Sequence, residues 1–294
     1  MKEKFKLYGS ILILVIFVPY LITVYLQGSS FFSLPGNEQN QKLEEQLTGI
    51  LAKEIPAVYE TECLKAQAVI ARTNLYREKE ETASKEGWTE AEMKAAWGEQ
   101  YEQYLEKIKN AVAQTKGEVI TFEGNLIQAA YHAASNKRTR NASEVPGQES
   151  FTYLVSVESS EDIAADNFLS ISYMEKQAFA EAIQGVFEGE TITADQLPGS
   201  LQITERDSAD YVTKLKYGST VANGEAVRKA LGLNSSCFYF SELAGQVRIV
   251  TKGIGHGLGF SQYGANQLAK KGYKYQELLK YYFQNIEIEQ MQNN

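Results

Sequence analysis

The sequence is poor in the residues that usually staple small secreted domains or hold metal ions. In 294 residues it has only two cysteines, Cys63 and Cys237, and two histidines, His132 and His256. Two cysteines exclude a zinc module held by four cysteines and a miniprotein stapled by several disulfides. With two histidines and no H-E-x-x-H pair, a catalytic zinc site is also disfavoured. The chain lacks a G-x4-G-K-[ST] phosphate loop, so ATP-dependent chemistry is not expected.

Basic charge and proline are scarce as well. The chain has 29 lysines and arginines against 37 aspartates and glutamates, for a formal net charge of −8. An acidic chain is a poor candidate for a cationic nucleic-acid binder, whose affinity comes largely from neutralising phosphates. Five prolines and a hydrophobic content of 44% exclude a disordered chain. The length is enough for one large domain or two lobes with a real core.

The N-terminus carries one long uncharged run. Three lysines lie within the first six residues, and the next charged residue is Glu38. About twenty apolar residues cross a bilayer as a helix, so we predict a cytoplasmic tail over residues 1–7 and a membrane anchor over 8–27. Lysines flanking an anchor stay in the cytoplasm, which places the rest of the chain outside. A cleaved signal peptide is the alternative, because small residues at 28–30 leave a weak cleavage site.

The remainder divides by composition. Residues 28–42 are polar and predict a linker, and residues 43–288 form the predicted ectodomain. Helical spacing dominates to about residue 115, and strands mixed with short helices follow, which predicts an α+β fold rather than a doubly wound one. Residues 81–115 are rich in glutamate, lysine and alanine. We interpret this stretch as a charged helical insertion with a solvated face.

Several strands are predicted after residue 118. Alternating apolar residues around a Gly/Asn turn predict a hairpin from Val119 to Tyr131. Further strands are expected at 153–157, 201–205, 212–217 and 247–251.

One carboxyl group stands at a predicted helix end. Pro56 biases Ile55 away from the helical region, so Glu54 lies at or just past the end of the first ectodomain helix. Lys65 and Arg72 are seven residues apart on the next helix and share one face. A carboxylate facing a basic stripe is a candidate catalytic acid. The alternative is an ordinary surface glutamate, because perturbed carboxylates are a minority.

Two further segments are candidates for chemistry. His132 is followed closely by Ser135, which suggests nucleophilic catalysis, but a lone histidine near a strand end is more often hydrogen-bonded structure. Glycine at every second position from Gly253 to Gly259 exposes one face of an extended segment, where a ligand or another backbone can approach closely. The spacing does not fit G-x-G-x-x-G, which disfavours a dinucleotide site.

The two cysteines leave two possibilities open. Outside the cell, Cys63 and Cys237 could form one disulfide, or they are two buried apolar thiols. Nothing in the sequence forces them together, so we favour free thiols.

Three segments together resemble a known family. The run GHGLGFSQYGANQLAKKGYKYQELLKYYF resembles the C-terminal signature of the stage II sporulation protein D family, also called the SpoIID/LytB domain. Glu54-Ile55-Pro56 with LKAQAVIARTNLY resembles the family's E-M-P and LKAQAVAARTYA segment. TKGEVITFEGNLIQAAYHAAS resembles its strand–turn–strand, followed by a histidine. The resemblance covers residues 43–288 and implies a membrane anchor and a substrate cleft.

The resemblance also implies a reaction. Family members are lytic transglycosylases that cleave the MurNAc–GlcNAc bond of peptidoglycan glycan strands and leave a 1,6-anhydro end. No water attacks, because the C6 hydroxyl of muramic acid attacks C1 internally. A single carboxyl group can then serve as acid and afterwards as base. Glu54 matches the family's catalytic glutamate and must carry a proton at neutral pH. No cofactor is implied.

Further site residues are hypothesised around Glu54. The residues expected to contact substrate are Lys65, Gln67, Arg72, His132, His256, Ser261, Gln262 and Tyr263. Some relatives hold zinc through a histidine and a cysteine in the loop that follows the hairpin. No cysteine follows His132 in that loop, so no metal is predicted.

The family setting is engulfment during endospore formation. It implies a single-pass protein on the mother-cell side of the sporulation septum, acting on peptide-stripped glycan with a sporulation amidase and a membrane scaffold partner. Two alternatives stay open. One is a non-catalytic glycan-binding activator of a cell-wall amidase, and the other is a scaffolding protein of the septum.

Overall fold

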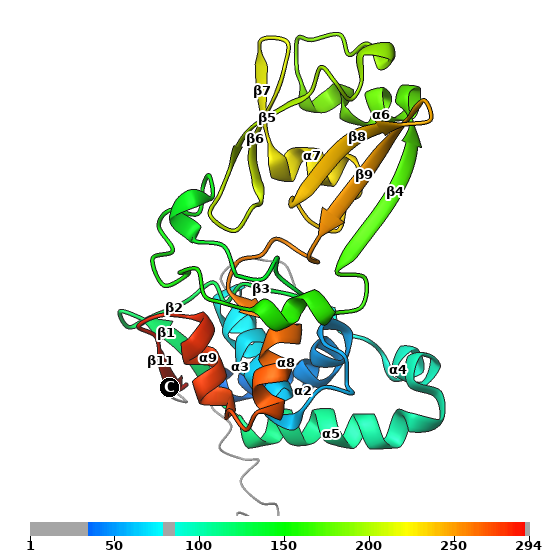
Figure 1. Ribbon diagram of the computed structural model, residues 1–294. Coiled ribbons are helices and arrows are strands. Elements are labelled where there is room, and N and C mark those ends of the chain that lie inside the picture. The colour runs from blue at the N-terminus through cyan, green and yellow to red at the C-terminus, as the bar shows by residue number, and fades with distance from the viewer. Residues whose placement is uncertain (1–34, 79–85, 292–294) are drawn as a thin grey trace, which may run out of the picture. The chain divides into compact units, whose positions relative to one another are not determined.

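The structure, a computed structural model, describes residues 35–78 and 86–291, with side chains from residue 43 (Figure 1). The predicted cytoplasmic tail and membrane anchor lie outside these residues. Within the described part of the chain, no helix is long and apolar enough to cross a membrane. Residues 46–291 form one compact unit.

The first half of the described chain is helical. Its helices are α2 (Pro35–Glu54), α3 (Thr61–Glu78), α4 (Glu90–Trp97) and α5 (Tyr101–Gln114). Helix α2 ends at Glu54 because Pro56 follows two residues later and disfavours helical geometry at Ile55. Helix α4 begins with a capping box, in which Thr89 and Glu92 bond each other's backbone N–H groups. The helical first part of the ectodomain that the spacing predicts is therefore present in the described residues.

Two small sheets lie next to these helices. In the first, β1 (Glu118–Phe122) pairs antiparallel with β2 (Asn125–Leu126) and with β11 (Glu287–Gln290). In the second, β3 (Tyr131–His132) pairs in parallel with β10 (Phe260–Ser261), so that Ser261 lies opposite His132. These two-residue strands bring segments from the middle and the end of the ectodomain side by side.

Two further sheets occupy the chain between residues 169 and 252. One has the strand order β4 (Leu169–Glu175), β9 (Gln246–Lys252), β8 (Phe238–Leu243), and the other β5 (Gln202–Arg206), β6 (Val212–Tyr217), β7 (Thr220–Asn223). Helices α6 (Lys176–Ile183) and α7 (Gly224–Ala230) contribute to the same buried cluster as these strands. This region has its own apolar core, which includes Phe179, Phe187 and Phe238.

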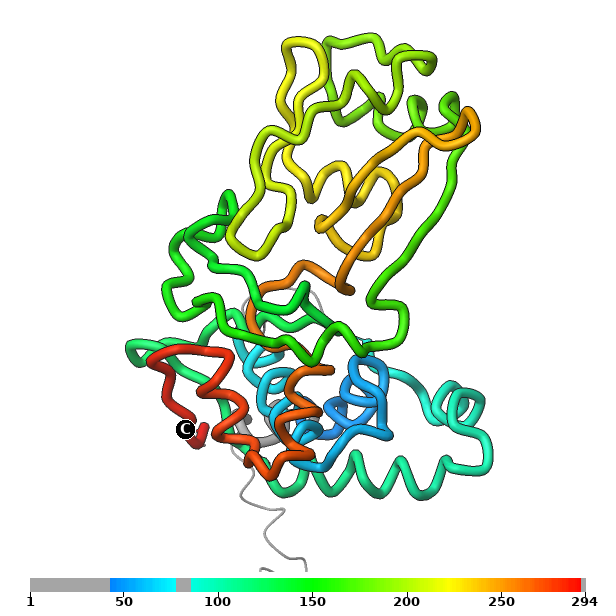
Figure 2. Tube along the Cα trace, viewed as in Figure 1, coloured from blue at the N-terminus to red at the C-terminus, as the bar shows by residue number. Residues whose placement is uncertain are grey.

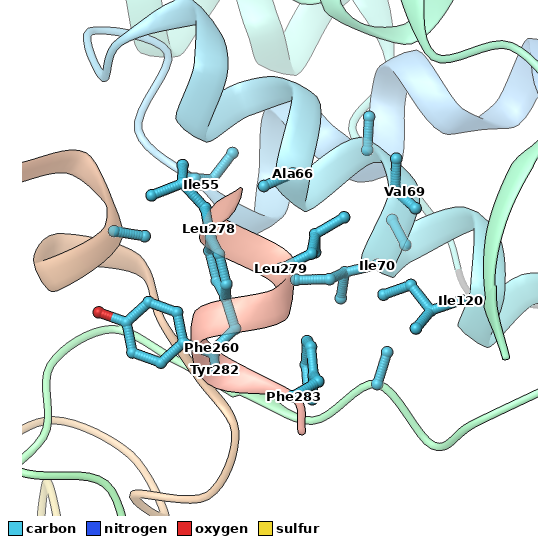
Figure 3. Close-up of a cluster of buried hydrophobic side chains, with 14 of the residues drawn as sticks. Ile55, Ala66, Val69, Ile70, Ile120, Phe260, Leu278, Leu279, Tyr282 and Phe283 are labelled. Carbon is cyan, nitrogen blue, oxygen red and sulfur yellow. The ribbon is translucent and has the colours of Figure 1, made fainter. Parts of the chain in front are cut away.

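The larger core surrounds α3. Helices α8 (Gln262–Lys270) and α9 (Tyr275–Tyr282) both contact α3, as the trace in Figure 2 shows. Figure 3 shows this core, with Ile55, Ala66, Val69, Ile70, Ile120, Phe260, Leu278, Leu279, Tyr282 and Phe283 labelled. Truncating a fully buried leucine in such a core typically costs about 2–5 kcal/mol. The packing of α8 and α9 therefore fixes the position of α3 and of the side chains on it.

The α+β prediction is confirmed, and two strand predictions are wrong in detail. The predicted second hairpin strand stops at Leu126, because Asn74 of α3 takes both backbone groups of Ala129, each at 3.0 Å. No strand forms at 153–157, where the backbone N–H of Val157 donates to the Thr139 hydroxyl instead of to a sheet. In both places a side chain from elsewhere in the fold replaces ladder pairing.

Candidate active site

Glu54 lies at the end of α2 against two buried glutamine amides. The Nε2 group of Gln67 on α3 donates to Oε2 of Glu54 at 3.1 Å. The Nε2 group of Gln262, the first residue of α8, donates to the backbone oxygen of Glu54 at 2.9 Å and to Oε1 of Gln67 at 3.3 Å. Gln67 and Gln262 are 0% and 5% exposed, whereas Glu54 is partly exposed. We call these three residues the amide cluster.

Helix α3 positions the amide cluster with two side chains one turn apart. Cys63 and Gln67 share a face of α3, and the Cys63 thiol donates to the backbone oxygen of Gln262 at 3.6 Å. Asn266, one turn further along α8, accepts from the backbone N–H of Glu60 at 2.8 Å. Both cysteines are buried free thiols, as predicted. Burial raises the pKa of Cys63, so it stays a protonated donor.

The alternating glycines form a second part of the site, which we call the glycine loop (residues 253–259). Their φ angles are +79, +110, +79 and +69° at Gly253, Gly255, Gly257 and Gly259. A Cβ atom on Gly255 would lie 2.6 Å from Cβ of His132, and one on Gly259 2.3 Å from a backbone oxygen. Of the two alternatives for this spacing, the structure shows the approach of another backbone, in the segment that carries β3.

Both histidines lie at this contact. The carbonyl oxygen of Leu258 can only accept, so Nδ1 of His132 donates to it, at 3.0 Å, and Nε2 is left as an acceptor. Nδ1 of His256 accepts from the backbone N–H of Leu258 at 3.1 Å, and the two rings are 5.7 Å apart between centroids. Burial lowers the pKa of His132 to about 3 and that of His256 to about 4. Both imidazoles are therefore neutral at neutral pH.

A buried carboxylate that the sequence did not single out joins the two parts of the site. Asp162 accepts from the backbone N–H and hydroxyl of Ser135, at 2.7 and 2.5 Å, and from the hydroxyl of Ser261, at 2.8 Å. Burial raises the pKa of Asp162. Ser261, which was expected to contact substrate, is fully buried. It fixes the start of α8, and with it Gln262.

Arg140 is a second residue that the sequence analysis missed. Its guanidinium bonds Asp207 at 2.5 Å, Glu225 at 3.1 Å and the backbone oxygen of His256 at 3.1 Å. It also lies 4.8 Å from the ring centroid of Tyr211. The Arg140 side chain is 2% exposed and that of Asp207 0%. A buried charge network of this kind persists only when each charge is compensated, and here it holds the glycine loop.

The predicted basic stripe on α3 does not exist as a shared surface. Arg72 is fully buried, and its guanidinium bonds the backbone oxygens of Val112 and Glu118, each at 3.2 Å. It thus ties α3 to α5 and β1 and has no exposed surface for a glycan. Lys65 instead pairs with Glu62 at 2.8 Å, and its side chain is 14% exposed. Two residues on one face of a helix can differ in burial, and here α5 and β1 cover α3 at Arg72.

The remaining predicted residues divide by exposure. Tyr263 and His256 are partly exposed, whereas His132, Gln67 and Gln262 are buried. The backbone N–H of Tyr263 donates to the carbonyl of Ala133 at 3.0 Å. Among residues 35–78 and 86–291, no three histidine, cysteine, aspartate or glutamate side chains lie close enough to hold a metal ion. The absence of the zinc site stays a prediction.

Comparison with known proteins gives consistent matches. The family model "Stage II sporulation protein" (SpoIID) matches residues 37–122, a range that contains Glu54 and Gln67. The chain is 32% identical over 265 residues to stage II sporulation protein D of Bacillus amyloliquefaciens, covering 85% of this chain and 75% of that protein. It is 31% identical, with the same coverage, to stage II sporulation protein D of Bacillus subtilis (strain 168). A protein of the same strain named "Amidase enhancer" is 25% identical over 285 residues, which cover 81% of this chain and 39% of that protein.

Proposed function

The chain belongs to the stage II sporulation protein D family, and on that premise we propose that it is a membrane-anchored lytic transglycosylase. Its proposed reaction is cleavage of the MurNAc–GlcNAc bond in peptide-stripped peptidoglycan strands, with 1,6-anhydro ends as products. The observation that carries the proposal is the amide cluster. It holds one partly exposed carboxyl group, that of Glu54, at a helix end, where the neutral amide of Gln67 donates to it.

In this mechanism Glu54 acts twice. Its carboxyl proton passes to the glycosidic oxygen while the bond from that oxygen to C1 of muramic acid breaks. The C6 hydroxyl oxygen of the same sugar then bonds to C1 and gives its proton to the Glu54 carboxylate. Glu54 ends the cycle protonated, no water is consumed, and no second carboxylate is required.

Neutral donors suit this cycle better than cationic ones. An ion pair with lysine or arginine would favour the charged carboxylate throughout and so oppose its protonation. Gln67 is uncharged, and the buried Arg72 guanidinium donates to backbone carbonyls of α5 and β1. The amide cluster therefore supplies the carboxyl group with an uncharged donor.

We assign substrate contacts to the exposed members of the predicted set. Lys65, Tyr263 and His256 retain exposed surface and are proposed to contact the glycan. His132 is buried and its Nδ1–H is used by Leu258, so it is proposed to hold the glycine loop rather than to contact the strand. The Lys65 ammonium would meet an acidic or hydroxyl-rich part of the strand.

The setting is proposed from the family. The protein would be anchored in the mother-cell membrane with residues 43–288 facing the septal wall during engulfment. It would act beside a membrane scaffold partner and a sporulation amidase that removes stem peptides first. Such an order would supply the peptide-stripped strands that the proposed reaction uses.

A second candidate function has one specific observation in its favour. The similarity to a protein named "Amidase enhancer" supports a non-catalytic glycan-binding module that activates a cell-wall amidase. In that case Glu54 would only help to bind glycan, and its exchange would weaken binding without removing any cleavage.

The test compares the full-length protein with Glu54→Gln and with Glu60→Gln, a control whose side chain is exposed. Each is incubated with peptide-stripped glycan strands, and soluble products are identified by mass spectrometry. We expect anhydro-ended fragments from the wild type and Glu60→Gln, and a rate about 10²–10⁴-fold lower for Glu54→Gln. Reducing-end fragments would overturn the proposal in favour of hydrolysis. Glycan binding with amidase stimulation and no fragments would select the second candidate.

A further inference from the structure

The hydrogen-bond directions in the amide cluster are fixed by one group that cannot change its role. The backbone oxygen of Glu54 has no hydrogen to donate, so the Gln262 atom that lies 2.9 Å from it must be the amide nitrogen. A glutamine amide has two N–H bonds. The second lies within reach of Oε1 of Gln67, at 3.3 Å. Both donors of Gln262 are therefore used.

This arrangement sets the orientation of the next amide. If Gln67 were flipped, its NH₂ group would face the NH₂ group of Gln262, and its carbonyl oxygen would face the Glu54 carboxylate. Two donors and two acceptors would then be opposed in a buried place, where each unpaired polar group costs about 1–3 kcal/mol. Gln67 and Gln262 are 0% and 5% exposed, so water cannot relieve these conflicts. Only one orientation of Gln67 satisfies all three residues.

The consequence falls on the orientation of the Glu54 carboxyl group. Oε2 accepts an N–H of Gln67 at 3.1 Å, and this bond requires the NH₂ group of Gln67 on that side. We propose that Gln262 locks Gln67 with its NH₂ group toward Oε2, so that the Glu54 carboxyl group is held in one orientation for both proton transfers. Gln67 and Gln262, hypothesised from the sequence as substrate contacts, are positioning residues. This inference rests on the proposed function for its kinetic consequence, but not for the hydrogen-bond order itself.

The protein offers a matched control for the effect of Gln262 on the orientation of Gln67, which we call the lock. Asn266 is on the same helix one turn after Gln262, is also buried, and also bonds the backbone near the α2–α3 junction, at Glu60. Asn266→Leu removes a buried amide as Gln262→Met does, but it leaves the amide cluster intact. A loss of activity through general destabilisation would appear in both variants, and a loss through the lock only in Gln262→Met.

The kinetic test uses Gln262→Met, Gln67→Met and the double variant of the full-length protein with peptide-stripped glycan strands. We expect each single variant to lower kcat about 10–100-fold, a part of what a positioned acid contributes, with KM changed less than about threefold. Because Gln262 acts through Gln67, the double variant should match Gln67→Met within about twofold. Multiplying effects, a change mainly in KM, or an equal loss in Asn266→Leu would overturn the proposal.

A spectroscopic test shows, independently of the reaction, whether Gln262 fixes the orientation of the Gln67 amide. In full-length protein with nitrogen-labelled glutamine, the Gln67 side-chain amide should give resolved, slowly exchanging protons in the wild type and in Asn266→Leu. In Gln262→Met these protons should exchange faster, and in Glu54→Gln their resonance should shift. An unchanged Gln67 amide in Gln262→Met would overturn the lock. If the wild type released no anhydro products, the proposed function would fail while this measurement still decided the lock.

Discussion

The amide cluster and the glycine loop are held by opposite kinds of group. The carboxyl group of Glu54, which stays partly exposed, accepts from the neutral amide of Gln67. In contrast, a buried guanidinium between two carboxylates holds the backbone beside the two histidines. An amide that donates a hydrogen bond to a carboxyl group can remain in place whether that group is protonated or not. A buried charge, in contrast, is strongly destabilising when its oppositely charged partner is lost. The two most distinctive segments of the chain therefore differ in purpose. The first suits a group that changes its proton, and the second suits a backbone that must not move.

Removing the charge at the centre of the glycine-loop network should have the largest effect on stability. Arg140→Met leaves Asp207 buried without its partner and releases the carbonyl of His256. We expect a loss of about 3–5 kcal/mol in the free energy of unfolding, measured by urea denaturation.

The control is Arg138→Met two residues earlier, which is exposed and bonds only the Ser156 hydroxyl among its described hydrogen bonds. It should cost less than about 0.5 kcal/mol. Equal effects of the two substitutions would contradict the distinction between the buried network and the surface.

Acid should destabilise the contact between the glycine loop and β3 through His132 and His256. Unfolded histidines bind protons near pH 6.5, whereas burial keeps the pKa of His132 at about 3 and that of His256 at about 4 in the folded state. The unfolded state thus binds more protons below about pH 6.5, and the stability that each buried histidine supplies falls with pH by about 1.4 kcal/mol per unit. Over two units each histidine should account for about 2 kcal/mol.

The measurement compares unfolding of the wild type with His132→Asn and His256→Asn between about pH 6.5 and 4.5. Asparagine keeps a donor or an acceptor near the position of Nδ1 but does not titrate. The raised pKa of Asp162 acts in the opposite direction, because it favours the folded state in acid, and it is common to all three proteins. Identical slopes in wild type and variants would show that the histidines are not buried as neutral groups.

The smallest effect on stability is expected near the amide cluster, at Lys65. Its ion pair with Glu62 is near the surface, where such pairs contribute about 0–1 kcal/mol. Lys65→Met should leave the unfolding free energy within about 1 kcal/mol of wild type and raise KM several-fold with kcat nearly unchanged. Lys271→Met, which removes an exposed pair with Glu161, serves as the control and should change neither. A loss of kcat alone in Lys65→Met would mean that Lys65 assists the reaction itself.

Local signals in the sequence predicted the elements and the place of Glu54. Pro56 marks the end of α2, and helical periodicity marks α3, so the position of the carboxyl group at a helix end could be derived. These features depend on residues within a few positions of one another, which is the range over which sequence patterns act.

The rest of the site depends on contacts that no local pattern encodes. Asp162 and Arg140 lie in polar stretches without periodicity, and their partners Ser261 and Asp207 are far along the chain. Strands β3 and β10 have two residues each, too few for an alternating pattern. The burial of Arg72 depends on where α5 and β1 pack, which is why its spacing from Lys65 misled the prediction.

In the proposed reaction, Glu54 alone serves as acid and base, and a sugar hydroxyl takes the place of water as the nucleophile. The most direct measurement is digestion of peptide-stripped glycan strands by the full-length protein in water enriched in heavy oxygen, followed by mass spectrometry of the new muramic ends. We expect anhydro ends that carry no heavy oxygen, formed by the wild type and not by Glu54→Gln. Incorporation of one heavy oxygen atom at each new end would contradict it, because water would then be the nucleophile.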